Sequence, residues 1–370
     1  MLNASGFIVL PKIPRLSSAL LLASHIAFAA AFAPTCAPHL PKFSTFTGLA
    51  PKPCPGSTAA ADTIRAGIGT RKPALSMEGG GGQTQWALMR ETFRGKWTGS
   101  TTWFGKVDKT SAGPIDWATP EIFMPESVYH ISFSDDLTGE WRGSGLRSQL
   151  PSTDTEKVLV MTGPMTSKTT CLFPGGLGGQ YSLEFSVADA KPGEVTSRRD
   201  VAHHPANEVN IFDDRARSML ISLYRAPPGG GPVVLESVVV APFRDALAAA
   251  APGPRSTYPS AEALLSSVEG WKGTQLTRVP EAWGEGKPDT FEGQVPKPVS
   301  LDPARYTSQE VCRTFIDNLI FAGPETITLG KPFELVYGAK ISDKEFKELV
   351  VSYEADGAFA SWKHAVYKAY

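Results

Sequence analysis

The chain has 370 residues, of which 42% are hydrophobic, so it can form a sizeable core and, by length alone, about two domains. Its formal net charge is −1, which excludes the strongly basic composition of a dedicated nucleic-acid-binding protein. Gly and Pro are abundant, at 35 and 31 residues, which is typical of turn-rich β structure rather than of a helical protein.

Residues 1–31 have the pattern of a secretory signal peptide. Lys12 and Arg15 form a basic segment, residues 16–31 are mostly apolar, and three alanines at the end fit a small-residue cleavage site. The apolar run is short for a membrane anchor, and Pro and Thr soon follow it. We therefore predict a cleaved signal peptide.

Residues 32–76 have the composition of a plastid transit peptide. Asp62 is their only acidic residue, while Ser, Thr, Ala and Pro are frequent. The junction Ala31-Phe32-Ala33-Pro34 resembles the Ala-Phe-Ala-Pro motif of algae with secondary red plastids, where the phenylalanine licenses entry into the organelle. We expect this two-part address to deliver the protein to the stroma of a complex plastid, free or peripheral to the thylakoid. Ordinary secretion with a propeptide is the alternative.

The chain that remains after residue 76 is acidic. Removing seven basic residues and one acidic residue from totals of 36 and 37 leaves a net charge of −7. We expect no nucleic-acid partner. No apolar run long enough to cross a bilayer follows Phe32, so an integral membrane protein is not expected. Cys171 and Cys312 have no zinc-binding spacing, and no metal is expected; free thiols and a bridge between them both stay open.

The first predicted unit spans residues 84–250 and begins with a short helix. Trp86, Met89, Arg90 and Phe93 have helical spacing, and a glycine then separates the helix from a β-rich run that starts at Trp97. Short β segments between turns fill the rest of the unit. Two of these segments carry aromatic residues on one face by strand alternation: Tyr129 with Phe133, and Tyr181 with Phe185.

The second predicted unit spans residues 258–370 and repeats the opening. Trp271-Lys272-Gly273-Thr274 matches Trp97-Thr98-Gly99-Ser100 after another short helix. Residues 280–303 are expected to form a long loop. The Asp-Gly pair at 356–357 predicts a hairpin, and the final strand is expected to pair with the first strand of the unit. We predict a mainly β protein of two antiparallel barrels, each opened by a short helix and closed at one end by Trp97 or Trp271.

These features resemble the DUF3598 family of cyanobacterial and plastid proteins, which has a calycin or lipocalin-like fold. The resemblance covers roughly residues 84–370 and is weakest at 280–305. It rests on the helix–Gly–Trp–x–Gly opening, on Phe173-Pro174-Gly175-Gly176 before the strand at 180–185, and on the segments 330–338 and 349–362. The family has no established active site. Relatives of the fold include phycobiliprotein chromophore lyases and xanthophyll de-epoxidases, but a fold does not fix a function.

The first functional hypothesis is a carrier or chaperone for a hydrophobic small molecule, in pigment handling or photosystem assembly. A small barrel is either filled by its own side chains or holds one apolar molecule. A tetrapyrrole, a carotenoid or a lipid would suit inward-facing aromatic residues, and photosynthetic proteins are the candidate partners. The expected ligand-binding residues are Tyr129, Phe133, Tyr181, Phe185, Arg199 and His203.

The second hypothesis is an enzyme, a lyase or isomerase acting on a bound chromophore. Arg198, Arg199 and His203 would provide an anion clamp and a proton shuttle, with Cys171 as a weaker nucleophile candidate. No hydrolase, metalloprotease or nucleotide-binding motif is present, so no catalytic residue is assigned and the sequence favours a protein without catalytic activity.

The third hypothesis is a structural subunit or assembly factor that uses the outer face of one barrel.

Overall fold

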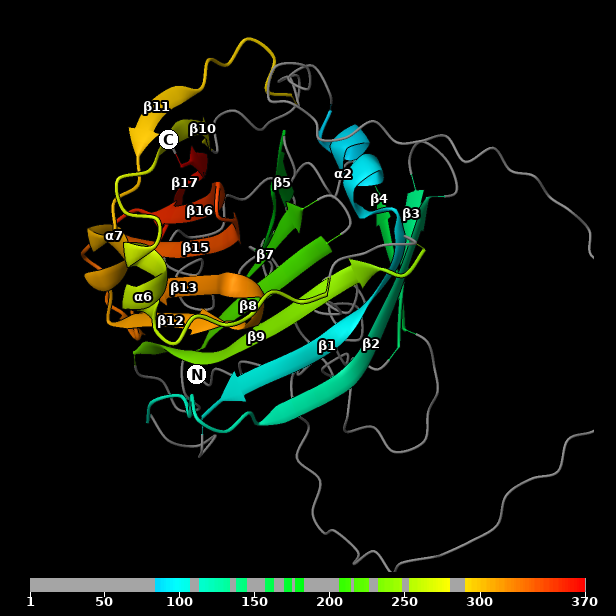
Figure 1. Cartoon of the computed structure of the whole chain (residues 1–370), viewed down its shortest axis with the longest axis horizontal. Helices are drawn as coiled ribbons and strands as arrows, with labels where there is room; N and C mark the ends of the chain where they lie inside the picture. Colours follow the sequence, from blue (N-terminus) through cyan, green and yellow to red (C-terminus); the bar gives the residue numbers. More distant parts are fainter. Residues whose placement is uncertain are drawn as a thin grey trace, which may run out of the picture.

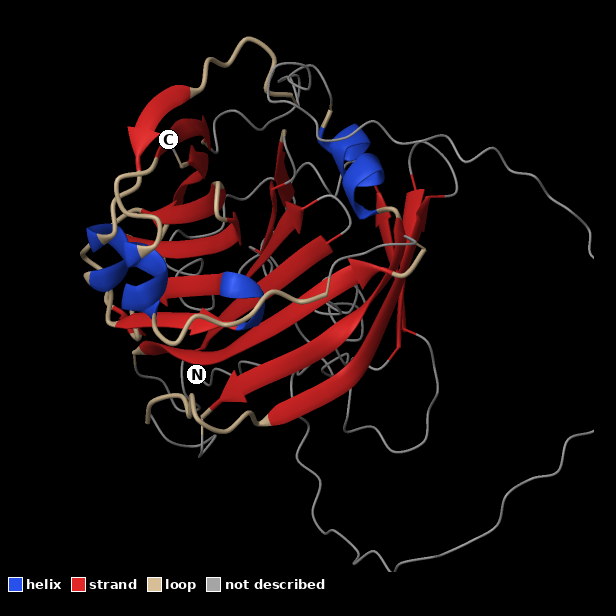
Figure 2. Ribbon diagram, viewed as in Figure 1, coloured by secondary structure: helices blue, strands red, loops and turns tan. Residues whose placement is uncertain are grey.

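The fold described here is a computed structural model. It describes residues 84–106, 113–133, 138–144, 157–162, 170–174, 177–182, 206–213, 216–225, 232–247, 253–279 and 290–369. The predicted signal peptide and transit peptide lie outside these residues. The described chain is mainly β, with a few short helices, as the sequence predicts (Figure 2).

The first sheet is an antiparallel meander that curls into a half-barrel (Figure 1). Its hydrogen-bonded order is β4-β3-β2-β1-β9-β8-β7-β6-β5, so the first and last strands of the meander lie side by side. The strands are β1 (Gly95–Gly105), β2 (Ile122–Phe133), β3 (Thr138–Ser144), β4 (Lys157–Thr162), β5 (Thr170–Phe173), β6 (Leu177–Ser182), β7 (Ala206–Asp213), β8 (Ala216–Arg225) and β9 (Val233–Asp245).

The second sheet has the same plan with fewer strands. Its order is β11-β10-β17-β16-β15-β13-β12, so here too the first strand pairs with the last, as predicted. The strands are β10 (Lys272–Arg278), β11 (Lys297–Ser300), β12 (Val311–Phe315), β13 (Leu319–Gly323), β15 (Phe333–Ser342), β16 (Glu345–Tyr353) and β17 (Phe359–Lys368).

Each sheet begins behind a short helix. In the first, α2 (Gln85–Phe93) is capped by the Thr84 hydroxyl, which accepts a bond from the amide of Ala87. In the second, α6 (Ala261–Ser266) is capped in the same way by Ser260. Gly95 and Gly270 have φ values of 151° and 76°, a region that glycine enters without steric cost, so the chain can leave each helix and enter a strand.

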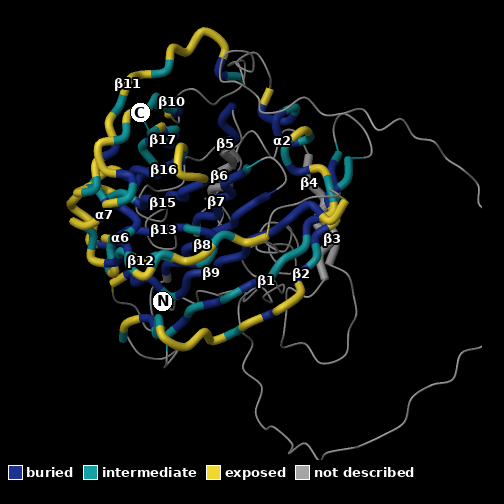
Figure 3. The backbone as a smooth tube through the Cα atoms, in the orientation of Figure 1, coloured by how far each residue is buried: buried dark blue, intermediate teal, exposed yellow. Residues whose placement is uncertain are grey.

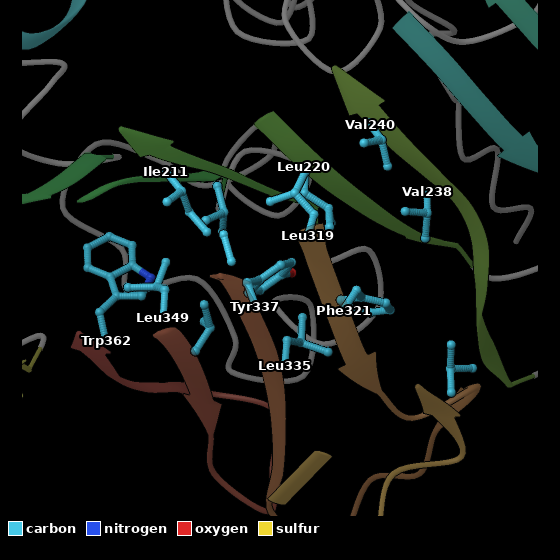
Figure 4. Packing of buried hydrophobic residues seen from close by; sticks show 14 of the residues in the cluster. Ile211, Leu220, Val238, Val240, Leu319, Phe321, Leu335, Tyr337, Leu349 and Trp362 are labelled. Atoms are coloured by element: carbon cyan, nitrogen blue, oxygen red, sulfur yellow. The ribbon is translucent and has the colours of Figure 1, made fainter. Parts of the chain in front are cut away.

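The two sheets pack face to face across a shared apolar core (Figure 4). Side chains from β7, β8 and β9 meet side chains from β13, β15, β16 and β17, and most of these residues are fully buried (Figure 3). The strand β14 (Thr326–Ile327) extends this contact, because it pairs with β9 of the first sheet. The labelled residues in Figure 4 are Ile211, Leu220, Val238, Val240, Leu319, Phe321, Leu335, Tyr337, Leu349 and Trp362.

A buried carboxylate also joins the two sheets. Asp317 lies in the turn η2 (Ile316–Asn318) before β13, and its side chain accepts hydrogen bonds from Arg244 of β9, from the amide of Arg255 and from the Ser218 hydroxyl of β8. Asp317 is fully buried and has a φ of 70°. Each sheet also has an inner face, which points away from the shared core.

One predicted loop is corrected by the structure. Residues 280–303 were expected to be a long loop, but β11 forms within them and pairs with β10 from Lys272 to Gln275. A proline-rich sequence hides this strand, because Pro298 can sit only where its missing N–H is not needed, as at the edge of a sheet. Residues 280–289 lie outside the described part of the chain.

Candidate functional site

The inner face of the first sheet is the candidate site. Strand alternation turns Trp97 and Trp103 of β1, Tyr129 of β2 and Phe243 of β9 onto this face, away from the shared core. The helix α2 crosses the open side of the half-barrel. Its Gln85 bonds to both the amide and the carbonyl of Leu172 in β5, at 2.6 and 2.9 Å. Toward the other side of the sheet, Trp86 makes an edge-to-face contact with Phe133 of β2.

The interior enclosed in this way is apolar and strongly aromatic. The aromatic residues gathered in it are Trp86, Phe93, Trp97, Trp103, Tyr129, Phe212 and Phe243, with Phe133 packed at the margin. Trp97 closes the end near α2, because its indole N–H donates to the carbonyl of Phe93 at 2.8 Å. A buried indole needs such a partner, and the last turn of the helix provides it.

Arg217 places a positive charge within this aromatic interior. It lies on β8, and its side chain is fully buried. Its guanidinium carbon is 5.5 Å from the ring centre of Phe93, 5.4 Å from Trp97, 5.3 Å from Tyr129 and 4.7 Å from Phe243. We call these four rings the cage. Their faces attract the cation, which explains part of its tolerance of burial.

In the described part of the chain, the guanidinium nitrogens of Arg217 have no hydrogen-bond partner. Nε and both terminal nitrogens are buried without an acceptor among the residues described. Burial lowers the pKa of Arg217 to about 10, while the nearby Glu208 carboxyl opposes this lowering. The side chain therefore remains protonated at neutral pH. A buried, charged group without hydrogen-bonding partners costs several kcal/mol, roughly, in the folded state.

Glu208 is the nearest acidic group, but it is bound to another residue. Its Oε1 accepts a hydrogen bond from the Asn210 side-chain amide at 2.7 Å, on the same face of β7. Burial raises the pKa of Glu208 to about 7, against the opposing effects of Asn210 and Arg217. Near neutral pH it therefore neutralises the charge of Arg217 only in part.

Two further polar atoms on this face have no hydrogen-bond partner in the described structure. They are Oδ1 of Asn210 and the hydroxyl of Ser237, and both are buried. Tyr129 completes the polar set, and burial raises the pKa of its phenol, with Glu208 adding to the effect. The phenol therefore stays protonated. The site consists of an apolar wall with a cation, a titrating carboxyl and a neutral phenol.

The inner face of the second sheet provides a natural comparison, because the strand registers match. Gly99 lies opposite Phe243, and Gly273 lies opposite Tyr367. Counting from these pairs, the position of Arg217 on β8 corresponds to Phe346 on β16. The buried cation of the first sheet thus has an apolar counterpart in the second.

Polar groups inside the second sheet are satisfied in part by neighbouring side chains, although the Tyr306 hydroxyl and Oε2 of Glu348 have no hydrogen-bond partner among the described residues. The buried Glu348 accepts from Arg305 and from the Tyr367 hydroxyl, both at 3.0 Å. Helix α7 (Ala304–Thr307) and α6 pack on this face, and Tyr306 is fully buried there. Lys340, the cation beside Trp271, donates to the Tyr258 hydroxyl at 2.7 Å and pairs with Asp343 at 3.1 Å. The two cations at this face, Arg305 and Lys340, therefore each have an acidic partner in the chain.

The structure brings some of the predicted site residues together. Tyr129, Phe133 and Trp97 share the inner face of the first sheet. Trp271 is half-buried against the core of the second sheet. Tyr181 lies in β6, but its side chain is outside the description, and Phe185, Arg198, Arg199 and His203 lie outside the described residues altogether. Cys171 faces the shared core, and Cys312 packs near the second sheet's inner face; both are free thiols.

Arg217, Glu208 and Asn210 were not predicted from the sequence. One sequence feature could have indicated Arg217. Every second residue after it is apolar, namely Met219, Ile221 and Leu223, so strand alternation places a charged residue on an apolar face. The neighbouring Asp213-Asp214 pair indicates only a hairpin between the strands on either side of it. None of the helices in the described part of the chain has the length and apolar character needed to cross a bilayer.

Comparison with known proteins identifies the fold. No protein-family model and no curated protein sequence matches the chain. Among solved structures, the chain resembles a protein of unknown function from the DUF3598 family of Nostoc punctiforme, with a TM-score of 0.50 and 14% identity over 78% of this chain and 100% of that one. This similarity confirms the expected fold. A double mutant of transferrin binding protein B from Haemophilus parasuis is far less similar, with a TM-score of 0.16 and 7% identity over 74% of this chain and 59% of that one.

Proposed function

We propose that the chain binds an amphipathic small molecule inside the first half-barrel. One observation carries this proposal: buried polar atoms without partners, on Arg217, Asn210 and Ser237, gather on an otherwise aromatic face. Buried polar groups in folded proteins are almost always hydrogen-bonded, so unpartnered groups on one face call for a partner from outside the chain. An apolar wall with a few convergent polar groups is the usual form of a small-molecule site.

The proposed ligand is a pigment, a tetrapyrrole or a lipid, and the proposed place of action is the plastid stroma. The aromatic lining favours a molecule with a long hydrocarbon or planar ring body. The address rests on the signal-like residues 1–31 and the acid-poor residues 32–76. Pigment handling or photosystem assembly would bring the protein into contact with such molecules and with photosynthetic proteins.

The ligand proposal is tested by isolating the protein from its source cells and extracting it with organic solvent. We expect an absorbing pigment or a lipid in near-stoichiometric amount, detected by absorption spectroscopy and mass spectrometry. An Arg217→Met variant purified in parallel should carry less of it. A colourless protein with no extractable lipid would overturn the proposal.

The location is tested by fusing residues 1–76 to a fluorescent protein in an alga with a secondary plastid. We expect fluorescence inside the plastid, and retention outside it when Phe32→Ala is introduced. Secretion of both fusions would contradict the plastid address and leave the ligand proposal standing.

Glu208 supports a second candidate function, a lyase or isomerase acting on the bound molecule. Its pKa of about 7 lies where a general acid or base works best, and Tyr129 is a protonated neighbour. If this activity exists, Glu208→Gln should abolish conversion of the extracted ligand while leaving its binding intact. Unchanged conversion in that variant would exclude Glu208 as the acid or base.

A further inference from the structure

We propose that Arg217 binds the carboxylate of the ligand, so that the first half-barrel selects amphiphiles with a single carboxylate group over their neutral analogues. This inference rests on the proposed function and specifies the chemical class of the ligand. It also fixes the ligand's orientation, because the acidic end must lie at the cage and the apolar body along the remaining inner face.

The guanidinium of Arg217 is suited to a carboxylate by its shape. Its five N–H groups form a rigid planar fork that matches two carboxylate oxygens. None of its three nitrogens has a hydrogen-bond partner among the described residues, so the hydrogen-bonding capacity of this fork is unused. Such bidentate, charge-assisted hydrogen bonds are roughly twice as strong as neutral ones.

The cage does not replace this missing partner. Four rings within 5.5 Å stabilise the positive charge of Arg217, but they provide no oxygen acceptor for its N–H groups. The rings also exclude water from the site, because Phe93, Trp97, Tyr129 and Phe243 are themselves nearly fully buried. Exclusion of water strengthens any ion pair that forms there.

Glu208 does not replace the partner either. Its carboxyl accepts a hydrogen bond from Asn210 at 2.7 Å on β7, and in the described part of the chain it does not bond to the Arg217 nitrogens. This arrangement keeps one acidic group close enough to influence the charge of the site and too far to bind the fork. The ligand's carboxylate would therefore enter an electrostatic environment that is still positive.

The number of charges favours one carboxylate over a phosphate. Arg217 is the basic residue that lies against the four rings of the cage, and Arg94, which follows α2, lies 5.9 Å from the ring centre of Phe133 at the margin of the cluster. A phosphate monoester would bring up to two negative charges beside Glu208, with one cation to balance them, and uncompensated buried charge is strongly unfavourable. A monoanion is balanced by Arg217 alone.

The second sheet provides a matched internal control. Lys340 is the cation beside Trp271, at 6.0 Å, but its ammonium already bonds to Tyr258 and Asp343. Where Arg217 would lie, this sheet has Phe346. Substitution of Lys340 should therefore leave binding of the acid unchanged.

The test uses the full chain and two series of probes in calorimetric or fluorescence titrations. One series is oleic acid, oleyl alcohol and methyl oleate, below the concentration at which the acid forms micelles. The other is pyropheophorbide a, a cyclic tetrapyrrole with one carboxyl group, and its methyl ester. Whichever series binds identifies the body of the ligand as an alkyl chain or a ring system. We expect the acid of that series to bind at least about 10-fold tighter than its neutral partner, since hydrogen bonds to charged groups are stronger than hydrogen bonds between neutral groups.

The variants separate the possible outcomes. Arg217→Met should reduce the affinity for the acid to that for the alcohol and leave the alcohol unchanged. Arg217→Lys, which keeps the charge without the fork, should retain part of the preference, and Lys340→Met should retain all of it. Thermal melting checks that each variant is folded.

Equal binding of acid and neutral partner would overturn the carboxylate inference and leave the proposed function intact. Failure of every probe in both series to bind would overturn both. A preference for the acid that survives in Arg217→Met would place the carboxylate elsewhere and also contradict the inference.

Discussion

Gly99 presses directly against the backbone of Pro242. A Cβ atom at residue 99 would lie 2.2 Å from the Pro242 carbonyl oxygen, on the strand that pairs with β1. Gly273 has the same relationship with Val366, where a Cβ would lie 2.1 Å from the carbonyl oxygen. The repeated Trp-x-Gly opening therefore has the same physical role in both sheets. The absence of a side chain at this glycine lets the first strand of each sheet lie close to the last strand, with which it pairs.

We expect Gly99→Ala and Gly273→Ala each to destabilise the fold by about 3 kcal/mol, because the strand pair must separate to accept a methyl group. Gly253→Ala is the matched control, since nothing lies within 4 Å of its added Cβ. Denaturant unfolding monitored by circular dichroism measures the difference. Equal stability of the Gly99 and Gly253 variants would contradict the close crossing.

Asp317 holds the two sheets together through its charge. Replacing it by Asn keeps a residue that tolerates its φ of 70° and removes the carboxylate that binds Arg244 and Arg255. We expect a loss of about 3–5 kcal/mol, the usual effect of removing one partner from a buried ion pair. Asp343→Asn is the control, because Asp343 is 97% exposed and its pair with Lys340 should contribute little.

The Asp317 contribution should also depend on pH. Burial favours the neutral acid, but hydrogen bonds from Arg244 and Ser218 and the charge of Arg255 hold the pKa of Asp317 below its ordinary value. The native state then binds the proton less readily than the unfolded chain, so the stabilisation is present above the ordinary aspartate pKa. It is lost as pH falls through the lowered pKa. Acid unfolding should be less steep in Asp317→Asn, and an unchanged acid limb would count against this role.

The expected effect of Arg217→Met on the empty protein is the opposite of that for Asp317→Asn. An unpaired buried cation is costly, so an apolar side chain of similar length should raise the free energy of unfolding by about 1–3 kcal/mol at neutral pH. The cage interactions lost with the charge make this gain smaller than the burial cost alone. A variant that is less stable than the native protein would indicate that Arg217 is structural and already satisfied.

Glu208 should make binding of a carboxylic acid sensitive to pH near neutrality. Because burial raises the pKa of Glu208 to about 7, its carboxyl becomes charged as pH rises through that value. The added negative charge opposes an anion at Arg217, so affinity should fall above about pH 7. Glu208→Gln should bind the acid with little change over the same range. An identical pH profile for both proteins would exclude this coupling.

The Glu208 carboxyl should also make the free energy of unfolding depend on pH. The folded pKa of Glu208 is above that of the unfolded chain, so the native state binds the extra proton between about 4.5 and about 7. Stability from this group is therefore greatest at the acidic end and decreases as pH rises to about 7. Relative to Glu208→Gln, the native protein should lose stability over this interval, as urea unfolding at several pH values can measure.

Much of the fold follows from local patterns in the sequence. The helix before Trp97, the strand alternation at Tyr129 and Phe133, and the pairing of the first and last strands of the second sheet were all predicted and are present. Each depends on periodicity or turn residues within a short segment. Strand β11 was missed because its short proline-containing segment has little local strand signal, and its pairing with β10 determines its structure.

The candidate site was harder to predict because it depends on contacts far apart in the chain. Arg217 meets rings from α2, β1, β2 and β9, and no local pattern indicates that these elements converge. The shared core between the sheets was also missed. The valines and leucines of β9 and β16 mark buried strands, but alternation alone does not say whether the second face packs on another sheet.

The most direct test of the account is the NMR signal of oleic acid labelled with carbon-13 at its carboxyl, bound to the full chain and followed as pH is lowered. If the ligand carboxylate pairs with Arg217, the bound carboxyl should remain ionised well below the pH at which free carboxylic acids protonate. In Arg217→Met the bound carboxyl should instead protonate in the ordinary range. A bound signal that titrates as a free acid does, in both proteins, would contradict this account.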